Sequence, residues 1–511
     1  LLIEKGGKTH YCLITDLNKM LHSQTKDKRR KHFCSYCLHG FIRKDLLDQH
    51  KPLCEKHGAQ CTELPSGKDK FMTFKNWGKM LKVPFVIYAD FECILSPLQN
   101  GKNKSHLHEP CGYSYLVVSA LEEAQREVVC YRGDNVVEHF FDDMIKESDY
   151  LLEQLKTNIP MIFTDEDEQV HGATNACFIC QEHMSPNDKV RDHCHFTGKY
   201  RGAAHFKCNL AFKHPKTIPV FFHNLEGYDS HLLMQHLGKY KNMKLSCIPA
   251  NSEKYISVTL GHLQFLDSLN FMNESLGKLV DNLAAEGDQH FHHIKRHFTD
   301  SEERKLLLRK GVYPYEWMDH ADKMEYTSLP EKEAFDSKLS LSSISDDDYT
   351  HAKNVWKTFH MQTMGDYHDL YLKTDVLLLA DVFENFRKKC LEYYALDPAH
   401  YYTAPGLSWD AALKMTKVNL ELLDDIEMHL MVEKGNINFS TVAFTVIIST
   451  NTMHSKCALS ISGVRGGVST ISTRYCKANN RFMQYYDEKK KIIYILDLDA
   501  NNLYGKQHKI L

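Results

Sequence analysis

The chain has 511 residues, of which 43% are hydrophobic, 25% charged and 11% aromatic. This composition supports large buried cores in about three to four domains, and it excludes a wholly disordered chain, a collagen and a small disulfide scaffold. No apolar run reaches the roughly 18 residues that a membrane-spanning helix needs. The formal net charge of -3 argues against a protein that binds nucleic acid through a uniformly basic surface.

The charge is unevenly distributed along the chain. Residues 1–85 carry 17 Lys and Arg against 8 Asp and Glu, and the remaining residues carry 46 against 58. A basic N-terminal part suggests contact with phosphates, and an acidic remainder suits metal-binding carboxylates, although ordinary solvated surfaces give similar counts. The start at Leu1 is neither a signal peptide nor an initiator Met, so we expect this chain to be part of a longer protein.

The first motif is a cluster of metal-ligand residues with the spacing of a zinc finger. A Cys pair two residues apart fits a tight turn, and a His and a Cys four apart share one face of a predicted helix at 42–51. The ligands are Cys34, Cys37, His50 and Cys54. The basic run at 26–31 before the cluster would add affinity for phosphates, so DNA binding is a hypothesis for this region. The alternative is a purely structural finger with a solvated basic linker.

An apolar strand at 83–89 leads into Asp90-Phe91-Glu92. Two carboxylates at i and i+2 project to the same side of a strand, which we expect to end in a loop there, so they are placed to share a divalent ion. The pair alone is common on surface loops. The buried strand makes it more specific, because an acidic pair there is costly unless it binds something.

A second cluster pairs Cys177 and Cys180 with His205 and Cys208, which again suits tetrahedral zinc. Between the pairs lies a His-rich stretch at 192–202 that resembles the recombination endonuclease VII group of His-Asn-His nucleases. The resemblance implies that His193 is a general base and that Asp192 and Asn209 hold a catalytic metal. A structural zinc module is favoured over an active second nuclease.

Further along, a buried strand at 218–223 runs into a turn that carries Asn224 and Tyr228 and then a helix at 230–237, with Asp229 as its predicted cap. A hairpin around Gly261 follows. Residues 285–365 are polar, with helices and loops, and a helix is predicted to start near Ser345. A strongly amphipathic helix at 367–387 places Tyr371 and Asp375 on one face.

Taken in order, these motifs resemble the three-motif signature of the DEDD type of 3′–5′ exonuclease. The resemblance implies a ribonuclease-H-like sheet that brings four carboxylates around two Mg²⁺ or Mn²⁺ ions, with Tyr371 orienting the water that attacks the phosphodiester. Asn224 and Tyr228 would contact DNA. The four carboxylates are Asp90, Glu92, Asp229 and Asp375.

The C-terminal part resembles motif A of family B DNA polymerases at 499–505, where Asp499 would bind the catalytic metal and Tyr504 would contact the incoming nucleotide. The wording of this motif and the run Arg465-Gly466-Gly467 are similar to the protein-primed branch. The whole chain, finger and zinc module included, resembles the DNA polymerases of Polinton (Maverick) mobile elements and related viruses.

Two features depart from that family's pattern. Residues 436–462 interrupt a passage that is continuous in such proteins, and the later palm motifs are absent after Asp499. One carboxylate does not hold two metal ions, so we expect residues 1–511 not to polymerise DNA. The chain is accordingly interpreted as an N-terminal fragment of a polymerase that retains the exonuclease half.

We therefore expect a mixed α/β protein with three parts. A basic region with a C2HC finger at 34–54 spans 1–82, a ribonuclease-H-like exonuclease domain spans 83–390 with the zinc module inserted at 170–214, and the start of a palm spans 391–511. The expected partners are single-stranded 3′ ends, a primer-template and a terminal protein primer, with no membrane. The cysteine pattern favours a reducing, intracellular location. The resemblance to mobile-element and viral polymerases implies the nucleus or a viral or mobile-element replication site. The alternatives are a stand-alone nuclease with His-Asn-His activity and a non-catalytic DNA-binding remnant.

Overall fold

The computed structural model describes residues 2–5, 8–22, 29–57, 63–98, 106–120, 126–251, 253–337 and 343–426. They belong to two compact units, one formed by 1–72 with 419–511 and the other by 73–418. The predicted polymerase residues Arg465, Gly466, Gly467, Asp499 and Tyr504, and the interruption at 436–462, lie outside the described residues. Within the described ranges, no helix combines the length and the apolar character needed to cross a membrane.

The first unit contains the predicted finger. Its short strands β3 and β4 pair antiparallel and precede helix α2, which lies later at both ends than the helix predicted at 42–51. The described elements of this unit are β1 (Leu2–Lys5), β2 (Lys8–Tyr11), α1 (Leu17–His22), β3 (His32–Phe33), β4 (Gly40–Phe41), α2 (Lys44–His57), β5 (Phe71–Met72) and β15 (Leu420–Glu421).

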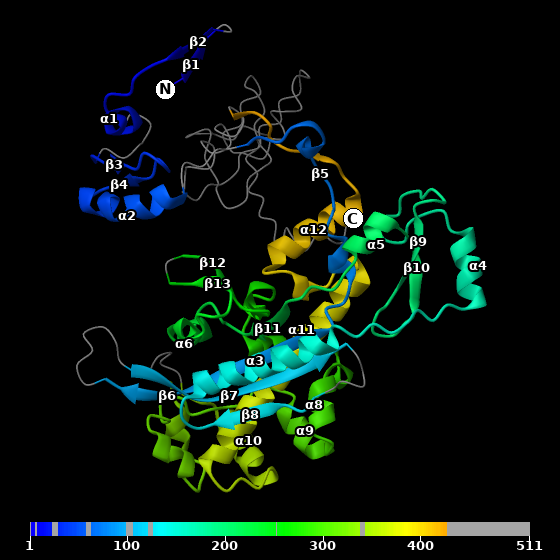
Figure 1. The fold of residues 1–511 in the computed structure, drawn as a ribbon. Coiled ribbons are helices and arrows are strands. Elements are labelled where there is room, and N and C mark those ends of the chain that lie inside the picture. Colours follow the sequence, from blue (N-terminus) through cyan, green and yellow to red (C-terminus); the bar gives the residue numbers. More distant parts are fainter. Residues whose placement is uncertain are drawn as a thin grey trace, which may run out of the picture. The chain divides into compact units, whose positions relative to one another are not determined.

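The second unit is built on a seven-stranded mixed sheet (Figure 1). The strand order is β12-β13-β14-β11-β6-β7-β8. Strand β11 is parallel to both of its neighbours, and the other pairs are antiparallel. The mixed α/β class is thereby confirmed. The strands are β6 (Phe85–Pro97), β7 (His106–Ser119), β8 (Val129–Arg132), β11 (Ile218–Phe222), β12 (Leu245–Pro249), β13 (Tyr255–Leu260) and β14 (Leu263–Asp267).

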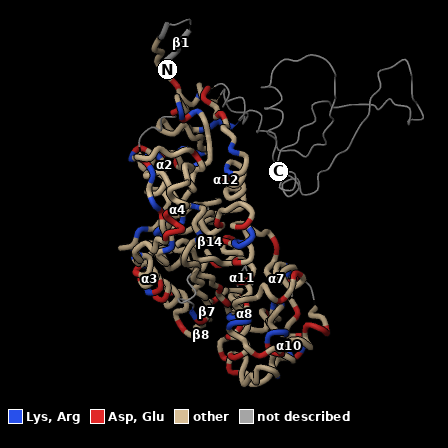
Figure 2. Tube along the Cα trace, turned by 90° about the vertical axis from the view of Figure 1, so that its right-hand side faces the viewer, with Lys and Arg blue, Asp and Glu red and all other residues tan. Residues whose placement is uncertain are grey.

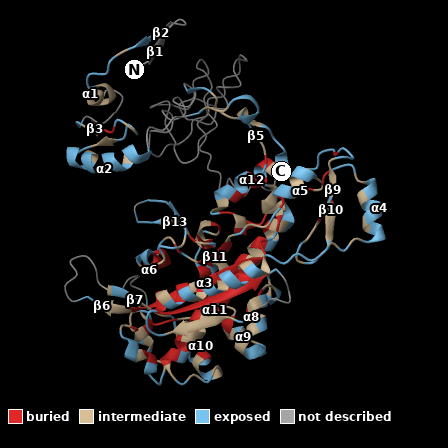
Figure 3. Cartoon of the chain, viewed as in Figure 1, coloured by how far each residue is buried: buried red, intermediate tan, exposed pale blue. Residues whose placement is uncertain are grey.

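Strand β6 is buried on both faces. Its side chains alternate between the two faces, and a different helix packs against each face. Phe85, Ile87 and Phe91 join the large core that also contains Phe140 of helix α3 (Val136–Gln154). Tyr88, on the other face, packs against Phe383 of α11. Figure 3 shows the resulting buried layer over β6, β7 and α11. Even-numbered residues of this strand segment therefore face α11.

The predicted end of this strand at residue 89 is wrong, because β6 continues to Pro97. Phe91, Cys93 and Ile94 are buried, so the apolar pattern that drives strand formation does not stop at Asp90. Asp90 and Glu92 consequently lie within the strand rather than in a loop after it. A register shift between Glu92 and Cys93 marks a β-bulge next to them.

Helix α11 (Met364–Tyr394) is longer than the predicted 367–387. It begins with a capping box between Thr363 and Asp366, and the residue that follows its last turn, Ala395, has a left-handed φ of 47°. The predicted helix start near Ser345 is confirmed, since its side chain caps α10. The remaining helices on this part of the chain are α7 (Leu276–Glu286), α8 (His292–His297), α9 (Ser301–Leu307), α10 (Asp346–Thr358) and α12 (Ala404–Thr416).

The predictions around the second buried strand are confirmed for the strand and for the hairpin. The turn between β13 and β14 contains Gly261 with a φ of +62°. Helix α6 (Asp229–His236) follows β11. The zinc module is formed by α4 (Asp165–Ala173), β9 (Lys189–His193), β10 (Tyr200–His205) and α5 (Phe206–Ala211).

A buried ion pair fastens the end of α11 to the start of β6. Arg387 is 1% exposed and donates to both carboxylate oxygens of Asp397, at 2.9 and 2.6 Å, and to the carbonyl of Val83 at 3.0 Å. Its guanidinium also pairs with Glu384. All three nitrogens of the guanidinium donate hydrogen bonds, which offsets the cost of removing this charge from water.

Breaking this pair should strongly destabilise the second unit. We expect Asp397→Ala to lower the free energy of unfolding by about 3–5 kcal/mol, because it leaves the buried guanidinium without its main partner. The exposed pair between Lys389 and Glu286 is the matched control, and Lys389→Met should cost less than about 1 kcal/mol. Urea unfolding of the full chain measures both, and equal effects of the two variants would contradict this account.

Candidate functional site

Three carboxylates from β6 and α11 meet on the α11 face of the sheet. One oxygen from each of Asp90, Glu92 and Asp375 lies within 4.8 Å of the others. They line a cavity of about 750 Å³. Glu92 and Asp375 are buried and Asp90 is half-buried. The structure thus brings together residues that are distant in sequence.

Asp229 lines the same cavity, but its predicted capping role is wrong. The residue that precedes the helix is Tyr228, and Asp229 is the first residue within α6. Its side chain is 2% exposed, and its Oδ1 atom has no hydrogen-bond partner among the described residues. The Oδ1 atom of Asp375 is equally without a partner there. Two buried carboxylate oxygens without partners beside a cavity could be satisfied by a bound cation.

The carboxylates disturb one another electrostatically. Burial, and then the charge of Asp375, raises the pKa of Asp90 to about 7. Burial and the charge of Asp90 raise the pKa of Glu92 well above its usual range, and they do the same for Asp229. Asp90 is therefore the common neighbour of the others. Such a group is unfavourable unless a cation neutralises it.

Lys310 supplies one positive charge to this group, and the sequence analysis missed it. Its ammonium donates to Asp375 and lines the cavity. Burial lowers the pKa of Lys310, but the charge of Asp375 outweighs this and holds it above its ordinary value. The sequence feature that could have indicated Lys310 is the run Lys-Gly-Val-Tyr-Pro-Tyr at 310–315, which lies within a polar region.

Tyr371 reaches the site through a second tyrosine from that run. Its hydroxyl lies 2.6 Å from the hydroxyl of Tyr315, and Tyr315 lines the cavity. A Cβ atom on Gly311 would stand 2.7 Å from the Tyr371 ring, so only glycine allows this approach. Sequence reasoning missed Tyr315 together with Lys310.

The turn after β11 presents Asn224 and Tyr228 to the cavity. Asn224 has a φ of 76°, and a Cβ atom on Gly227 would lie 2.4 Å from its Oδ1 atom. Asp267, at the end of β14, accepts hydrogen bonds from the backbone of Asn224 at 2.8 Å and of Glu226 at 2.9 Å. The neighbouring parallel strand therefore holds the turn in place, and Asp267 had no sequence signal.

The donor set fits hard divalent cations. Carboxylate oxygens are the preferred ligands of Mg²⁺ and Mn²⁺, and the unpaired oxygens of Asp229 and Asp375 offer further donors. Asp90, Glu92 and Asp375 would hold such an ion, with Asp229 on the same cavity.

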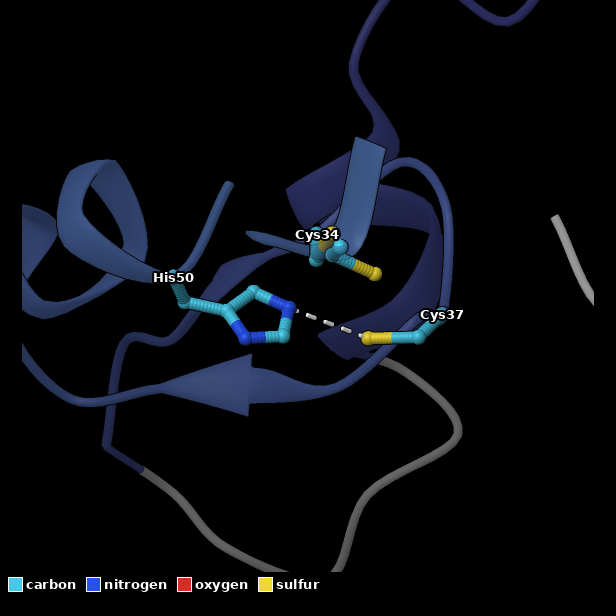
Figure 4. A group of neighbouring side chains, drawn as sticks. Cys34, Cys37 and His50 are labelled. Atoms are coloured by element: carbon cyan, nitrogen blue, oxygen red, sulfur yellow. Dashed lines mark hydrogen bonds between the residues drawn. The ribbon is translucent and has the colours of Figure 1, made fainter. Parts of the chain in front are cut away.

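The finger brings its four predicted ligands together. Figure 4 shows the sulfurs of Cys34 and Cys37 and the ring of His50 directed toward one another, and the four ligand atoms, with Cys54, lie within 4.8 Å. Burial raises the pKa of Cys34, but backbone hydrogen bonds from Cys37 and Tyr36 and a bond with His50 lower it to about 6. A Cys3His set of this kind is typical of structural zinc.

The second cluster is equally well formed. Cys177, Cys180, His205 and Cys208 lie within 4.8 Å of one another, and the Cys180 sulfur is 3.3 Å from His205 Nδ1. The surrounding small core includes Ile179, Met184 and Phe212. The cluster therefore joins the turn that starts at Cys177 to the end of β10 and to α5, as a structural zinc ion would.

The residues of the endonuclease-like stretch are arranged differently from a metal site. Asp192 is 3% exposed, and Arg201 donates to both of its carboxylate oxygens. The ring of His193 lies beside that of His195 at 4.9 Å, and Asn209 is half-buried on α5. Helix α4 opens with acidic residues, red in Figure 2. Because the guanidinium already neutralises Asp192, this group does not fit a divalent ion.

Replacing Lys310 should strengthen divalent-ion binding. In Lys310→Met the carboxylates lose their internal cation, so Mn²⁺ should raise the thermal midpoint more than in the unchanged protein. In Asp375→Asn a ligand is lost, and the rise should nearly vanish. Differential scanning fluorimetry over a Mn²⁺ titration measures this, with Glu392→Gln on exposed α11 surface as the control. Equal Mn²⁺ responses in all variants would refute the site.

Each Cys3His cluster should contribute one zinc ion to the purified chain. Cys34→Ser and Cys177→Ser should each lower the zinc content by about one equivalent, because a structural site needs all four ligands. Cys247→Ser, at an exposed cysteine outside both clusters, should leave it unchanged. Elemental analysis by mass spectrometry gives the stoichiometry, and unchanged zinc in both cluster variants would exclude these sites.

Comparison with known families gives two matches. Residues 211–499, more than half of the chain, match the family described as DNA polymerase type B, organellar and viral. Residues 154–228 match recombination endonuclease VII. No curated protein and no solved structure matches the chain.

The first match contains Asn224, Asp229, Lys310 and Asp375, whereas Asp90 and Glu92 precede it. The second contains the Cys177 cluster and overlaps the start of the first. The resemblances to family B DNA polymerases and to recombination endonuclease VII are thereby confirmed. The chain belongs to the organellar and viral family of type B DNA polymerases and carries an endonuclease VII domain.

Proposed function

We propose that residues 83–390 form a 3′–5′ exonuclease that proofreads DNA synthesis by its polymerase. The observation that carries this proposal is the meeting of Asp90, Glu92 and Asp375 within 4.8 Å, beside Asp229 on one cavity. The family match supplies the DNA context, and the carboxylates supply the chemistry of phosphodiester hydrolysis.

The sheet supports a ribonuclease-H-like assignment for this domain. Strands β6, β7 and β8 form an antiparallel meander, and β11 and β14 extend it on the other side of β6, both in the direction of β6. This arrangement places the carboxylates of β6 in the middle of the sheet, next to the turn that carries Asn224 and Asp229. Helix α11 then brings Asp375 to the same face.

Each residue of the site has a role in phosphodiester hydrolysis that follows from its position. When bound, divalent ions would activate water and stabilise the leaving 3′ oxygen, and Asp90, Glu92, Asp229 and Asp375 would hold them. Lys310 places a positive charge beside the same group, where a scissile phosphate would be neutralised. Tyr315 and Tyr371 form a hydroxyl pair at the cavity that would orient the attacking water. Asn224 and Tyr228 would contact the strand.

We propose that both Cys3His clusters bind structural Zn²⁺. Their geometry supports the Cys₃His set of zinc ribbons and fingers. The finger precedes the exonuclease domain in sequence, and its basic flank would contact DNA phosphates.

A DNA endonuclease activity of the inserted module is the second candidate. The match of residues 154–228 to recombination endonuclease VII favours it. The pairing of Asp192 with Arg201 opposes it, since a carboxylate with both oxygens bound to a guanidinium is a poor ligand for a catalytic metal. We therefore favour a structural role for this module.

Removing the first carboxylate should abolish the exonuclease. Asp90→Ala and Asp375→Asn should each reduce Mn²⁺-dependent digestion of a 5′-labelled single strand by at least about a hundredfold, because each removes a direct metal ligand. Glu392→Gln, on exposed α11 surface, should digest at the unchanged rate. Gel electrophoresis of the labelled products measures the rates.

Undiminished digestion by Asp90→Ala would disprove the exonuclease assignment. If nicking of circular duplex DNA persists in Asp90→Ala but is lost in His193→Ala, the endonuclease activity would be established instead.

A further inference from the structure

A buried histidine lies behind the wall of the acidic cavity. His368 stands on helix α11 about two helical turns before Asp375, and the spacing places it on the same face as Tyr371 and Asp375. Its side chain is completely buried. It reaches the cavity through its neighbour Tyr313, which lines it.

The imidazole of His368 is enclosed on two sides. Its Nδ1 atom lies 2.8 Å from the hydroxyl of Tyr313. Its Nε2 atom faces the backbone of Gly112, where a Cβ atom would stand 2.8 Å from it, so a larger residue would displace the ring. Gly112 pairs with Glu92 in the register of β6 and β7. The histidine therefore fills the space between the backbone opposite a carboxylate of the site and the Tyr313 hydroxyl.

One nitrogen of this histidine is unsatisfied. The Nε2 atom is buried and has no hydrogen-bond partner among the described residues. Burial, and then the charge of Arg132, lowers the pKa of His368 to about 3, so the ring is neutral at neutral pH. A buried polar atom without a partner costs stability, which an apolar residue of the same size would avoid. The presence of a histidine therefore indicates a requirement for its bond to Tyr313.

The ring of Tyr313 supports the ring of Tyr371. Their centroids lie 4.9 Å apart, with 30° between the ring planes. The Tyr371 hydroxyl in turn lies 2.6 Å from that of Tyr315 at the cavity. Because the rings are in contact, a shift of Tyr313 would move the Tyr371 hydroxyl. The bond to His368 fixes Tyr313 at its polar end and so prevents that shift.

We propose that His368 is a positioning residue, which through the Tyr313 hydroxyl holds the Tyr371 hydroxyl in its place beside the carboxylates. This inference rests on the proposed exonuclease and deepens it, because the hydroxyls of Tyr315 and Tyr371 are the groups that would orient the attacking water. His368 acts through other side chains. Its loss should therefore slow hydrolysis without weakening the binding of DNA.

The test compares His368→Leu, His368→Asn and Tyr313→Phe in the full chain. His368→Leu should lower kcat for Mn²⁺-dependent digestion of a single-stranded oligonucleotide about three- to tenfold, with KM changed less than about twofold, because a hydroxyl is displaced but no metal ligand is lost. His368→Asn keeps a polar atom near the position of Nδ1 and should recover most of the loss. Tyr313→Phe should match His368→Leu, and the double variant should be no slower, because both changes remove the same bond.

The matched control is Tyr88→Phe, which removes another buried tyrosine bond to α11, at 2.8 Å from Glu384. It should destabilise the chain about as much as Tyr313→Phe but leave kcat unchanged. In a Tyr371→Phe background, the effect of His368→Leu on kcat should vanish. An undiminished effect in that background, or a kcat of His368→Leu equal to that of the unchanged protein, would overturn the proposal.

A crystal structure of the His368→Leu chain gives a readout that does not depend on digestion. The Tyr371 hydroxyl should lie beyond hydrogen-bond distance of the Tyr315 hydroxyl, whereas both should keep their places in Tyr88→Phe. If the unchanged chain does not digest DNA, the proposed exonuclease fails, but a displaced Tyr371 hydroxyl would still support the positioning role of His368. An unmoved Tyr371 hydroxyl in His368→Leu would contradict that role.

Discussion

The candidate site depends on the neutralisation of a group of carboxylates on one face of a sheet. Asp90, Glu92 and Asp375 lie close enough to share an ion, and Asp229 lines the same cavity. Each charge raises the pKa of a neighbour, and two of the oxygens lack hydrogen-bond partners among the described residues. Lys310 supplies a single positive charge, which is insufficient for four carboxylates. A protein tolerates such an arrangement when a function requires it, and bound divalent ions would complete the charge balance.

The scaffold holds these charges in place through packing on both sides of the sheet. Helix α3 covers the face opposite the site, while α11 brings Asp375 toward β6 and is fastened by the buried pair of Arg387 and Asp397. Asp267 fixes the turn before Asp229 through two backbone hydrogen bonds. Because each ligand stands on an element that is packed or bonded at its base, the site is preorganised rather than assembled by its ions.

Local patterns predicted the strands and the two Cys3His clusters well, and the acidic site less completely. The alternation of apolar residues and the spacing of metal ligands act over short stretches of sequence. The strand at 218–223, the Gly261 hairpin and both Cys3His clusters could therefore be predicted from the sequence. The meeting of Asp90 with Asp375 followed only from motif order, since no local rule joins them. The strand through Asp90 was cut short because an acidic pair looks like a strand end, although the apolar residues continue beyond it. Lys310 and Tyr315 were missed, because their importance comes from contacts that only the folded chain creates.

The most direct test is an experimental structure of the chain with Mn²⁺ and an oligonucleotide that resists cleavage, using anomalous scattering to locate the ions. The account predicts Mn²⁺ peaks bound by Asp90, Glu92 and Asp375, with the Lys310 ammonium moved from Asp375 toward the phosphate and the strand in contact with Tyr228. A structure with millimolar Mn²⁺ and bound DNA that shows no ion in contact with Asp90 would contradict it.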